Sequence, residues 1–269
     1  MRFRWLAFFP LVYVALFILI AWQLGGAPGL QTFVIGQRIF VRLLAVVGCF
    51  LAVSVFERGD HLRNAWLWLG GGAILILFLD VLRQLPGFAE NPSLAAKMTL
   101  SGVGVLSNIA LLAGIWTLSR SWKRAAIELP GGRGAIVTIY TITILLALAV
   151  TGPDAYTAVR QLLGGDVSAI LPFVSAVVDV ITLCLITPLL LIAVSLRGGS
   201  FVWPWGLLTA SQVCWLLYDG ADGLTRLFSL GGFPIAETFR GLAETLLFCA
   251  GVAQYLVIRQ VRRGVLAVA

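Results

Sequence analysis

The sequence is poor in charge and has almost no histidine. Only 12% of its 269 residues are charged, and His61 is the single histidine. Soluble domains usually have about a quarter of their residues charged, so this chain has too few charged side chains to coat a soluble protein. One histidine also excludes haem ligation by paired histidines and the two-histidine helix of zinc proteases.

Sequence motifs for catalysis are also missing. None of G-x-x-x-x-G-K-[ST], G-x-S-x-G or H-E-x-x-H occurs. The four cysteines, Cys49, Cys184, Cys214 and Cys249, lie far apart in apolar stretches, which favours small buried thiols. We therefore expect no metal and no cofactor, and the sequence argues against an enzyme.

Apolar residues dominate what remains. They make up 60% of the chain, and the mean hydropathy is +0.99. A run of about 20 apolar residues can cross the bilayer as a helix. The sequence predicts an all-α integral membrane protein with eight transmembrane helices, over residues 5–24, 33–56, 65–85, 98–119, 135–151, 168–196, 203–221 and 238–258.

The distribution of charge predicts an orientation. Twelve of the nineteen Lys and Arg residues, but only three of the twelve acidic residues, fall on the side of the N-terminus. By the positive-inside rule both termini are cytoplasmic, and the net charge of +7 reflects topology rather than nucleic-acid binding. Six tryptophans at the predicted inner ends are expected to form an interfacial belt: Trp5, Trp66, Trp68, Trp122, Trp203 and Trp205.

The source membrane is also predicted from composition. The chain has two lysines and seventeen arginines, a usage typical of a GC-rich genome. We expect a bacterial inner membrane, with the lipid bilayer and other membrane subunits as partners.

When the sequence is aligned with itself at an offset of 139 residues, several uncommon residue types coincide. Asp80 falls on Asp219 and Trp66 on Trp205 without a gap. The shift predicts two parallel repeats, 1–130 and 131–269, each of four helices, related by an axis along the membrane normal.

Ionisable residues inside the spans are the candidate functional residues, because charge at membrane depth is costly. They gather in the outer half of the predicted bundle, with nearly balanced charge. We expect Asp179 to pair with Arg38 or Arg42, and Arg42, Asp179 and Glu244 to form the floor of any cavity. The candidate ligand-binding residues are Arg38, Arg42, Asp179, Asp219, Asp222, Arg240 and Glu244.

Two interpretations of this charged layer remain open: a structural salt-bridge layer, or a polar cavity between helices. The sequence favours a sensory or ligand-binding module, or a subunit of a larger membrane complex. An alternative is a transporter of a small solute or ion, with a midplane site near Asp179 and Glu244. A second alternative is an intramembrane lipid-modifying enzyme that uses paired carboxylates such as Asp219 and Asp222.

Overall fold

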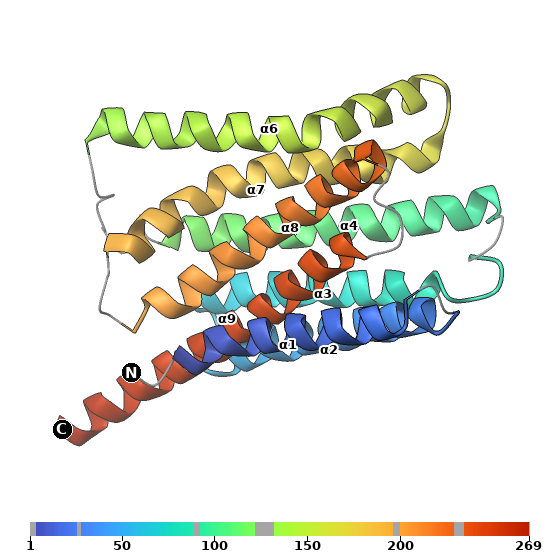
Figure 1. The fold of residues 1–269 in the computed structure, drawn as a ribbon. Coiled ribbons are helices and arrows are strands. Elements are labelled where there is room, and N and C mark those ends of the chain that lie inside the picture. The colour runs from blue at the N-terminus through green and yellow to red at the C-terminus, as the bar shows by residue number, and fades with distance from the viewer. Residues whose placement is uncertain are drawn as a thin grey trace.

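The computed structural model describes residues 4–25, 28–88, 92–121, 132–195, 200–228 and 234–268, and this part of the chain is helical without strands. The long helices lie side by side, with α8 and α9 inclined to α3, α4 and α6 (Figure 1). They are α1 (Arg4–Gln23), α2 (Pro28–Ser54), α3 (His61–Leu82), α4 (Leu94–Ser119), α6 (Arg133–Leu163), the short 3-10 helix η1 (Val167–Ala169), α7 (Ile170–Ser195), α8 (Val202–Phe228) and α9 (Ile235–Val268).

Seven of these helices are long and apolar enough to cross a membrane, which confirms the predicted class of helical membrane protein. The exception is α8, which covers the predicted span 203–221. Its 27 residues are long enough. Its apolar run, however, is interrupted by Gln212 and Asp219, and both of these side chains line a cavity described below. These two polar side chains of α8 therefore face the interior of the bundle.

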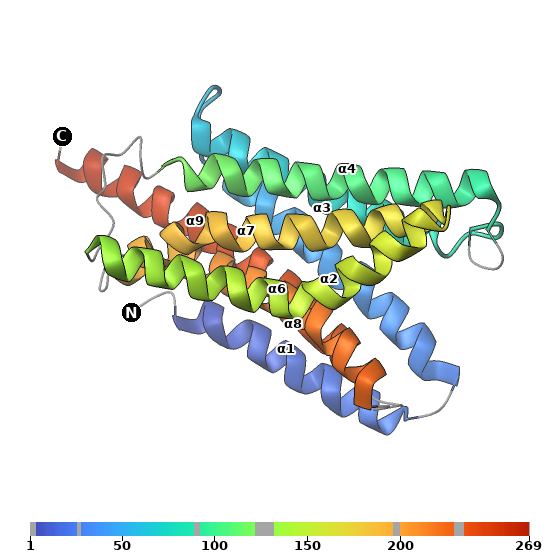
Figure 2. The same ribbon diagram turned by 90° about the horizontal axis from the view of Figure 1, so that it is seen from above.

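Six helices form a closed ring. Each of α2, α3, α4, α7 and α8 packs against the next, and α9 packs against both α8 and α2. The other two long helices lie outside the ring: α6 packs on α7 and α8 (top of Figure 1), and α1 packs on α9 (bottom of Figure 2). The ring therefore encloses the centre of the bundle.

The predicted repeat stays a prediction. The order α2, α3, α4 followed by α7, α8, α9 around the ring is the order that two parallel repeats would give. The outer helices do not follow it, because α6 packs against the helix that succeeds it, whereas α1 packs on α9.

α2 and α9 cross at two glycines. A Cβ on Gly48 would lie 2.6 Å from the Cα of Phe248, and a Cβ on Gly251 would overlap the carbonyl oxygen of Gly48. The absence of side chains lets the two backbones approach closely, as small residues do in membrane helix pairs. This crossing holds α2 and α9 close together about two turns from the ion pair between Arg42 and Glu244.

Apolar side chains close the ring at the end where α1 begins and α9 ends, which we call the terminal end; the opposite end is the far end (Figure 1). Buried there are Trp66, Leu69, Ile115, Leu118 and Leu208.

One of these residues corrects an expectation. Trp66 was predicted in an interfacial belt, but it is 2% exposed and packs in the core. Trp5 and Trp68 are exposed, Trp203 and Trp205 are partly buried, and Trp122 lies outside the described residues.

Candidate functional site

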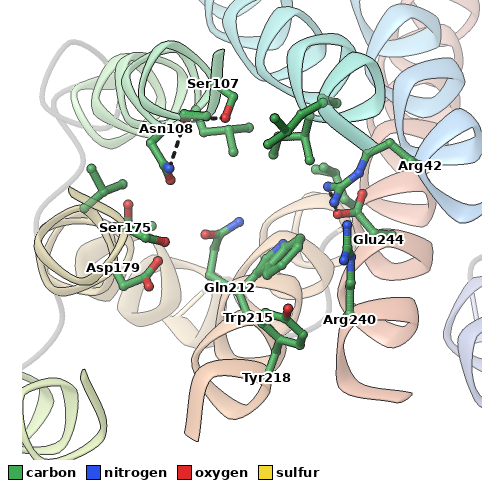
Figure 3. Close-up of a pocket in the computed structure, with 18 of the residues that line it drawn as sticks. Arg42, Ser107, Asn108, Ser175, Asp179, Gln212, Trp215, Tyr218, Arg240 and Glu244 are labelled. Atoms are coloured by element: carbon green, nitrogen blue, oxygen red, sulfur yellow. Dashed lines mark hydrogen bonds and ion pairs between the residues drawn. The ribbon is translucent and has the colours of Figure 1, made fainter. Parts of the chain in front are cut away.

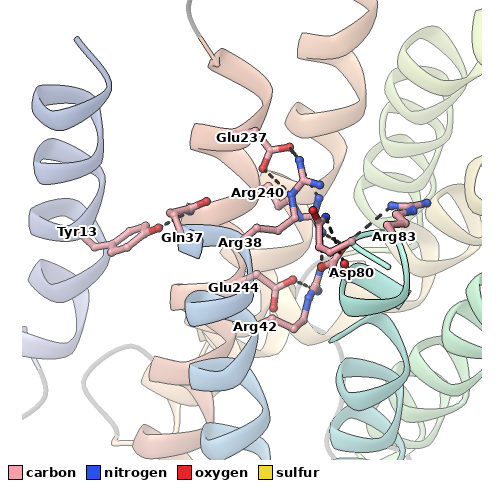
Figure 4. A network of polar contacts seen from close by, with 10 residues as sticks. Tyr13, Gln37, Arg38, Arg42, Asp80, Arg83, Glu237, Arg240 and Glu244 are labelled. Carbon is pink, nitrogen blue, oxygen red and sulfur yellow. Dashed lines mark hydrogen bonds and ion pairs between the residues drawn. The ribbon is translucent and has the colours of Figure 1, made fainter. Parts of the chain in front are cut away.

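Asp80 of α3 is the centre of a buried network of ion pairs toward the far end (Figure 4). Arg240 Nη2 on α9 donates to both carboxylate oxygens of Asp80, at 3.0 and 2.7 Å. Two further arginines approach the same carboxylate. Arg42 on α2 lies 3.8 Å from it, and Arg83, about one helical turn after Asp80 in the sequence, lies 3.9 Å from it. One carboxylate thus ties together α2, α3 and α9.

Two further pairs join α2 to α9. Arg42 pairs with Glu244, and their side chains are 2% and 1% exposed. Arg38 pairs with Glu237 at 2.6 Å, and Glu237 also lies 3.8 Å from Arg240. Buried ion pairs fix the relative register of the helices that carry them, because breaking one leaves an uncompensated charge in low dielectric.

The arginines of the network also lie against aromatic rings of α8. The guanidinium carbon of Arg42 is 5.3 Å from the ring centre of Trp215, and that of Arg240 is 6.0 Å from the ring of Tyr218. Trp215 and Tyr218 touch edge to face. These contacts orient the guanidinium groups, since cations are attracted to aromatic faces within about 6 Å.

The network does not use all of its own hydrogen-bonding groups. Arg42 Nε and Nη2, Arg240 Nε and Glu244 Oε2 are buried and have no hydrogen-bond partner among the described residues. Buried polar atoms are nearly always hydrogen-bonded, so unused atoms of this kind call for a partner such as water or a ligand.

A cavity of about 180 Å³ lies inside the ring, next to this network. Figure 3 shows labelled side chains surrounding it, with Asp179 and Ser175 on one side and Arg42, Arg240 and Glu244 on the other. All six ring helices contribute to its lining. The polar and charged lining residues are Arg42, Asp80, Arg83, Ser107, Asn108, Ser175, Asp179, Thr182, Gln212, Trp215, Tyr218, Asp219, Arg240 and Glu244.

A second cavity, of about 390 Å³, adjoins the first between α6, α7 and α8. The two share Leu171, Ser175, Tyr218 and Asp219 in their linings. Since the second is also lined by Asp154 and other polar residues of α6, a polar region continues from the centre of the ring to the outer helix α6.

Asp179 does not pair with an arginine of α2, and this prediction was wrong. Its carboxyl lies within hydrogen-bonding reach of the carboxyl of Asp219 on α8. The arginines of α2 pair instead with Glu237 and Glu244 of α9. The physical reason is the ring order: α9 lies directly against α2, whereas Asp179 faces them across the cavity.

The carboxyl pair formed by Asp179 and Asp219 differs chemically from the network. Asp179 Oδ2 is buried and receives no hydrogen bond from the described residues. Carboxylates are acceptors only, so two carboxyl groups hydrogen-bond to each other only when one carries a proton. This wall of the cavity can therefore hold a proton, or a cationic group in its place.

Five of the seven predicted site residues line one cavity: Arg42, Asp179, Asp219, Arg240 and Glu244. Arg38 belongs to the ion-pair network and does not line the cavity. The side chain of Asp222 lies outside the described residues.

Some lining residues were missed. Asp80 is not among the predicted ligand-binding residues, although its alignment with Asp219 was a usable signal. Gln212, an amide in the middle of an apolar run, was a second signal. Within the described part of the chain, no group of three or more His, Cys, Asp or Glu residues is placed to hold a metal ion.

Comparisons with known proteins gave no relative. No family model matches the sequence. No curated protein matches it, and no solved structure matches the fold.

Proposed function

We propose that this protein binds a small polar solute in the cavity inside the six-helix ring, as the ligand-binding module of a membrane receptor or of a larger membrane complex. The observation that carries the proposal is a set of buried polar atoms beside the cavity, on Arg42, Asp179 and Glu244, that have no hydrogen-bond partner among the described residues. Ionisable residues inside membrane spans typically mark pathways or sites for polar ligands.

A purely structural role accounts less well for these atoms. Leaving a buried donor or acceptor unsatisfied costs about 1–3 kcal/mol, so a layer that served only to lock helices together would be expected to satisfy its own groups. A ligand or water in the cavity supplies the missing partners. The network then serves as the fixed wall of a binding site.

We also propose that the far end faces the outside of a bacterial inner membrane, with both termini in the cytoplasm. The excess of arginine and lysine on the terminal side supports this orientation. The apolar core at the terminal end separates the cavity from that side. Reporter fusions test it: a C-terminal green fluorescent protein should fluoresce, whereas alkaline phosphatase at the same place should be inactive. The opposite pair of results would overturn the orientation.

Solute binding is tested by thermal unfolding of the protein in lipid nanodiscs, with amino acids, polyamines, dicarboxylates and sugars as probes. At least one solute should raise the melting temperature of the native chain. The same solute should have no effect on Ser175→Trp, which fills the space shared by both cavities. If no solute shifts the melting temperature, the proposal fails.

A transporter is the second candidate, and the two adjoining cavities favour it. A polar region that reaches α6 on one side and ends at an apolar core on the other is what one state of an alternating-access protein would contain. Counterflow of a bound solute into liposomes distinguishes the two: a transporter exchanges it across the membrane, and a receptor module does not.

A further inference from the structure

The two sides of the cavity carry opposite charge, and from this we infer that its ligand is a small zwitterion. The anionic group of the ligand would lie against Arg42 and Arg240, and its cationic group against Asp179. This inference rests on the proposed function and adds the chemical class of the ligand.

The side formed by α2, α3 and α9 has a surplus of positive charge. Three arginines there line the cavity, Arg42, Arg83 and Arg240, against the two carboxylates of Asp80 and Glu244. Arg42 and Arg240 also have buried N–H groups without an acceptor among the described residues. A carboxylate or phosphate satisfies both the surplus charge and the free donors, because guanidinium groups bind such anions through paired hydrogen bonds.

The opposite side, formed by α7 and α8, contributes carboxyl groups instead. Asp179 and Asp219 lie beside each other there, and Asp179 Oδ2 receives no hydrogen bond from the described residues. No arginine or lysine among the described residues forms an ion pair with Asp179. An ammonium group placed here would form an ion pair with Asp179, as a buried charge requires.

Neutral polar side chains also line the cavity. Asn108, Ser175 and Gln212 surround the centre of the cavity (Figure 3), and they can hydrogen-bond the middle of a ligand. The volume suits a small molecule. An ammonium and an acidic group on one small framework occur both in free amino acids and in the headgroup of phosphatidylethanolamine.

Titration with matched probes tests the inference, using the full chain in nanodiscs of phosphatidylglycerol and phosphatidylcholine. The zwitterions are ω-amino acids from glycine to 6-aminohexanoate, together with phosphoethanolamine. Each amino acid is compared with the acid and the amine of equal chain length, for example γ-aminobutyrate with butyrate and n-butylamine. We expect at least one zwitterion to bind at least tenfold more tightly than both of its single-charge analogues.

A second set of nanodiscs, containing phosphatidylethanolamine, separates the two sources of the ligand. If the headgroup is the ligand, this lipid should compete with the soluble zwitterion. If the ligand is a free solute, affinity should be the same in both sets of nanodiscs. Either result supports a zwitterion site.

Variants assign the two charges to the two walls. Asp179→Asn should reduce the affinity for the zwitterion at least tenfold, to that of the matched acid, and should leave the affinity for the acid itself unchanged. The matched control is Glu57→Gln, whose carboxylate is exposed at the terminal end and should change neither affinity.

Equal binding of zwitterion and acid, or of zwitterion and amine, would overturn the inference while the proposed function stands. The absence of binding by every member of the series would overturn the inference as well. In that case the wider solute panel described above decides the proposed function separately.

Discussion

Asp80 and Asp179 are the same residue type and both line one cavity, Asp80 as a buried residue and Asp179 as a half-buried one, yet their surroundings differ. Asp80 is held by Arg240 at 2.7 Å and approached by Arg42 and Arg83. Asp179 lies beside the carboxyl of Asp219 and forms no ion pair with a cation of the described residues. An ionisable residue at membrane depth can therefore belong either to a structural ion pair or to a binding site. The charge on the neighbouring helix decides which of the two roles it has.

Neutralising Asp80 should have the largest effect. Asp80→Asn keeps the shape of the side chain but leaves Arg240 without its closest carboxylate. Removing one partner of a buried ion pair typically costs about 3–5 kcal/mol. We expect a loss of this size in the free energy of unfolding, measured by denaturant titration in detergent. A variant as stable as the native chain would show that the ion-pair network does not hold the helices together.

The second-largest loss of stability is expected from a substitution where α2 and α9 cross. In Gly251→Ala the new methyl group meets backbone atoms of Gly48, which have no free rotamer to move away. Overpacking of this kind costs about 1–3 kcal/mol. Gly71→Ala on α3 is the matched control, because a Cβ there has open space around it and should leave the melting temperature unchanged. Equal melting temperatures for the two variants would contradict the close crossing.

The replacement of aspartate by asparagine, which is expected to destabilise the protein at position 80, should hardly change the free energy of unfolding at position 179. Asp179→Asn replaces a carboxyl that no described cation compensates, and the amide can donate to Asp219 the hydrogen bond that two carboxyl groups make only with a shared proton. We expect the free energy of unfolding to change by less than about 1 kcal/mol, in the direction of greater stability. A loss as large as that of Asp80→Asn would mean that Asp179 also locks the bundle, and the comparison would fail.

The smallest effect is expected at an exposed pair. Glu57 and Arg262 lie 3.8 Å apart near the terminal end, with 89% and 53% of their side chains exposed. Exposed ion pairs contribute about 0–1 kcal/mol. Glu57→Gln should therefore leave the melting temperature within error of the native value, and a clear decrease would show that solvent does not screen this end of the bundle.

The sequence predicted the membrane class because runs of about 20 apolar residues leave few alternatives. It also brought Arg42 and Glu244 together as deep charges, and the structure places them in one cavity. It failed on the partner of Asp179, because depth along a helix says nothing about rotation or about which helices are neighbours. Trp66 shows the same limit, since its position near a helix end fits a belt and a buried core equally well.

The most direct test of the account is whether water reaches the carboxyl side of the cavity while the packed interface of α8 and α9 stays closed. In a background without the four native cysteines, Ser175→Cys places a thiol in the lining of both cavities. Ser211→Cys places one where the native hydroxyl is fully buried and hydrogen-bonded to the carbonyl oxygen of Ala243. A water-soluble methanethiosulfonate reagent should label position 175 rapidly and position 211 hardly at all. Equally slow labelling of both positions would contradict the account. It would mean that water does not reach the cavity and that the charged layer is only a structural layer of ion pairs.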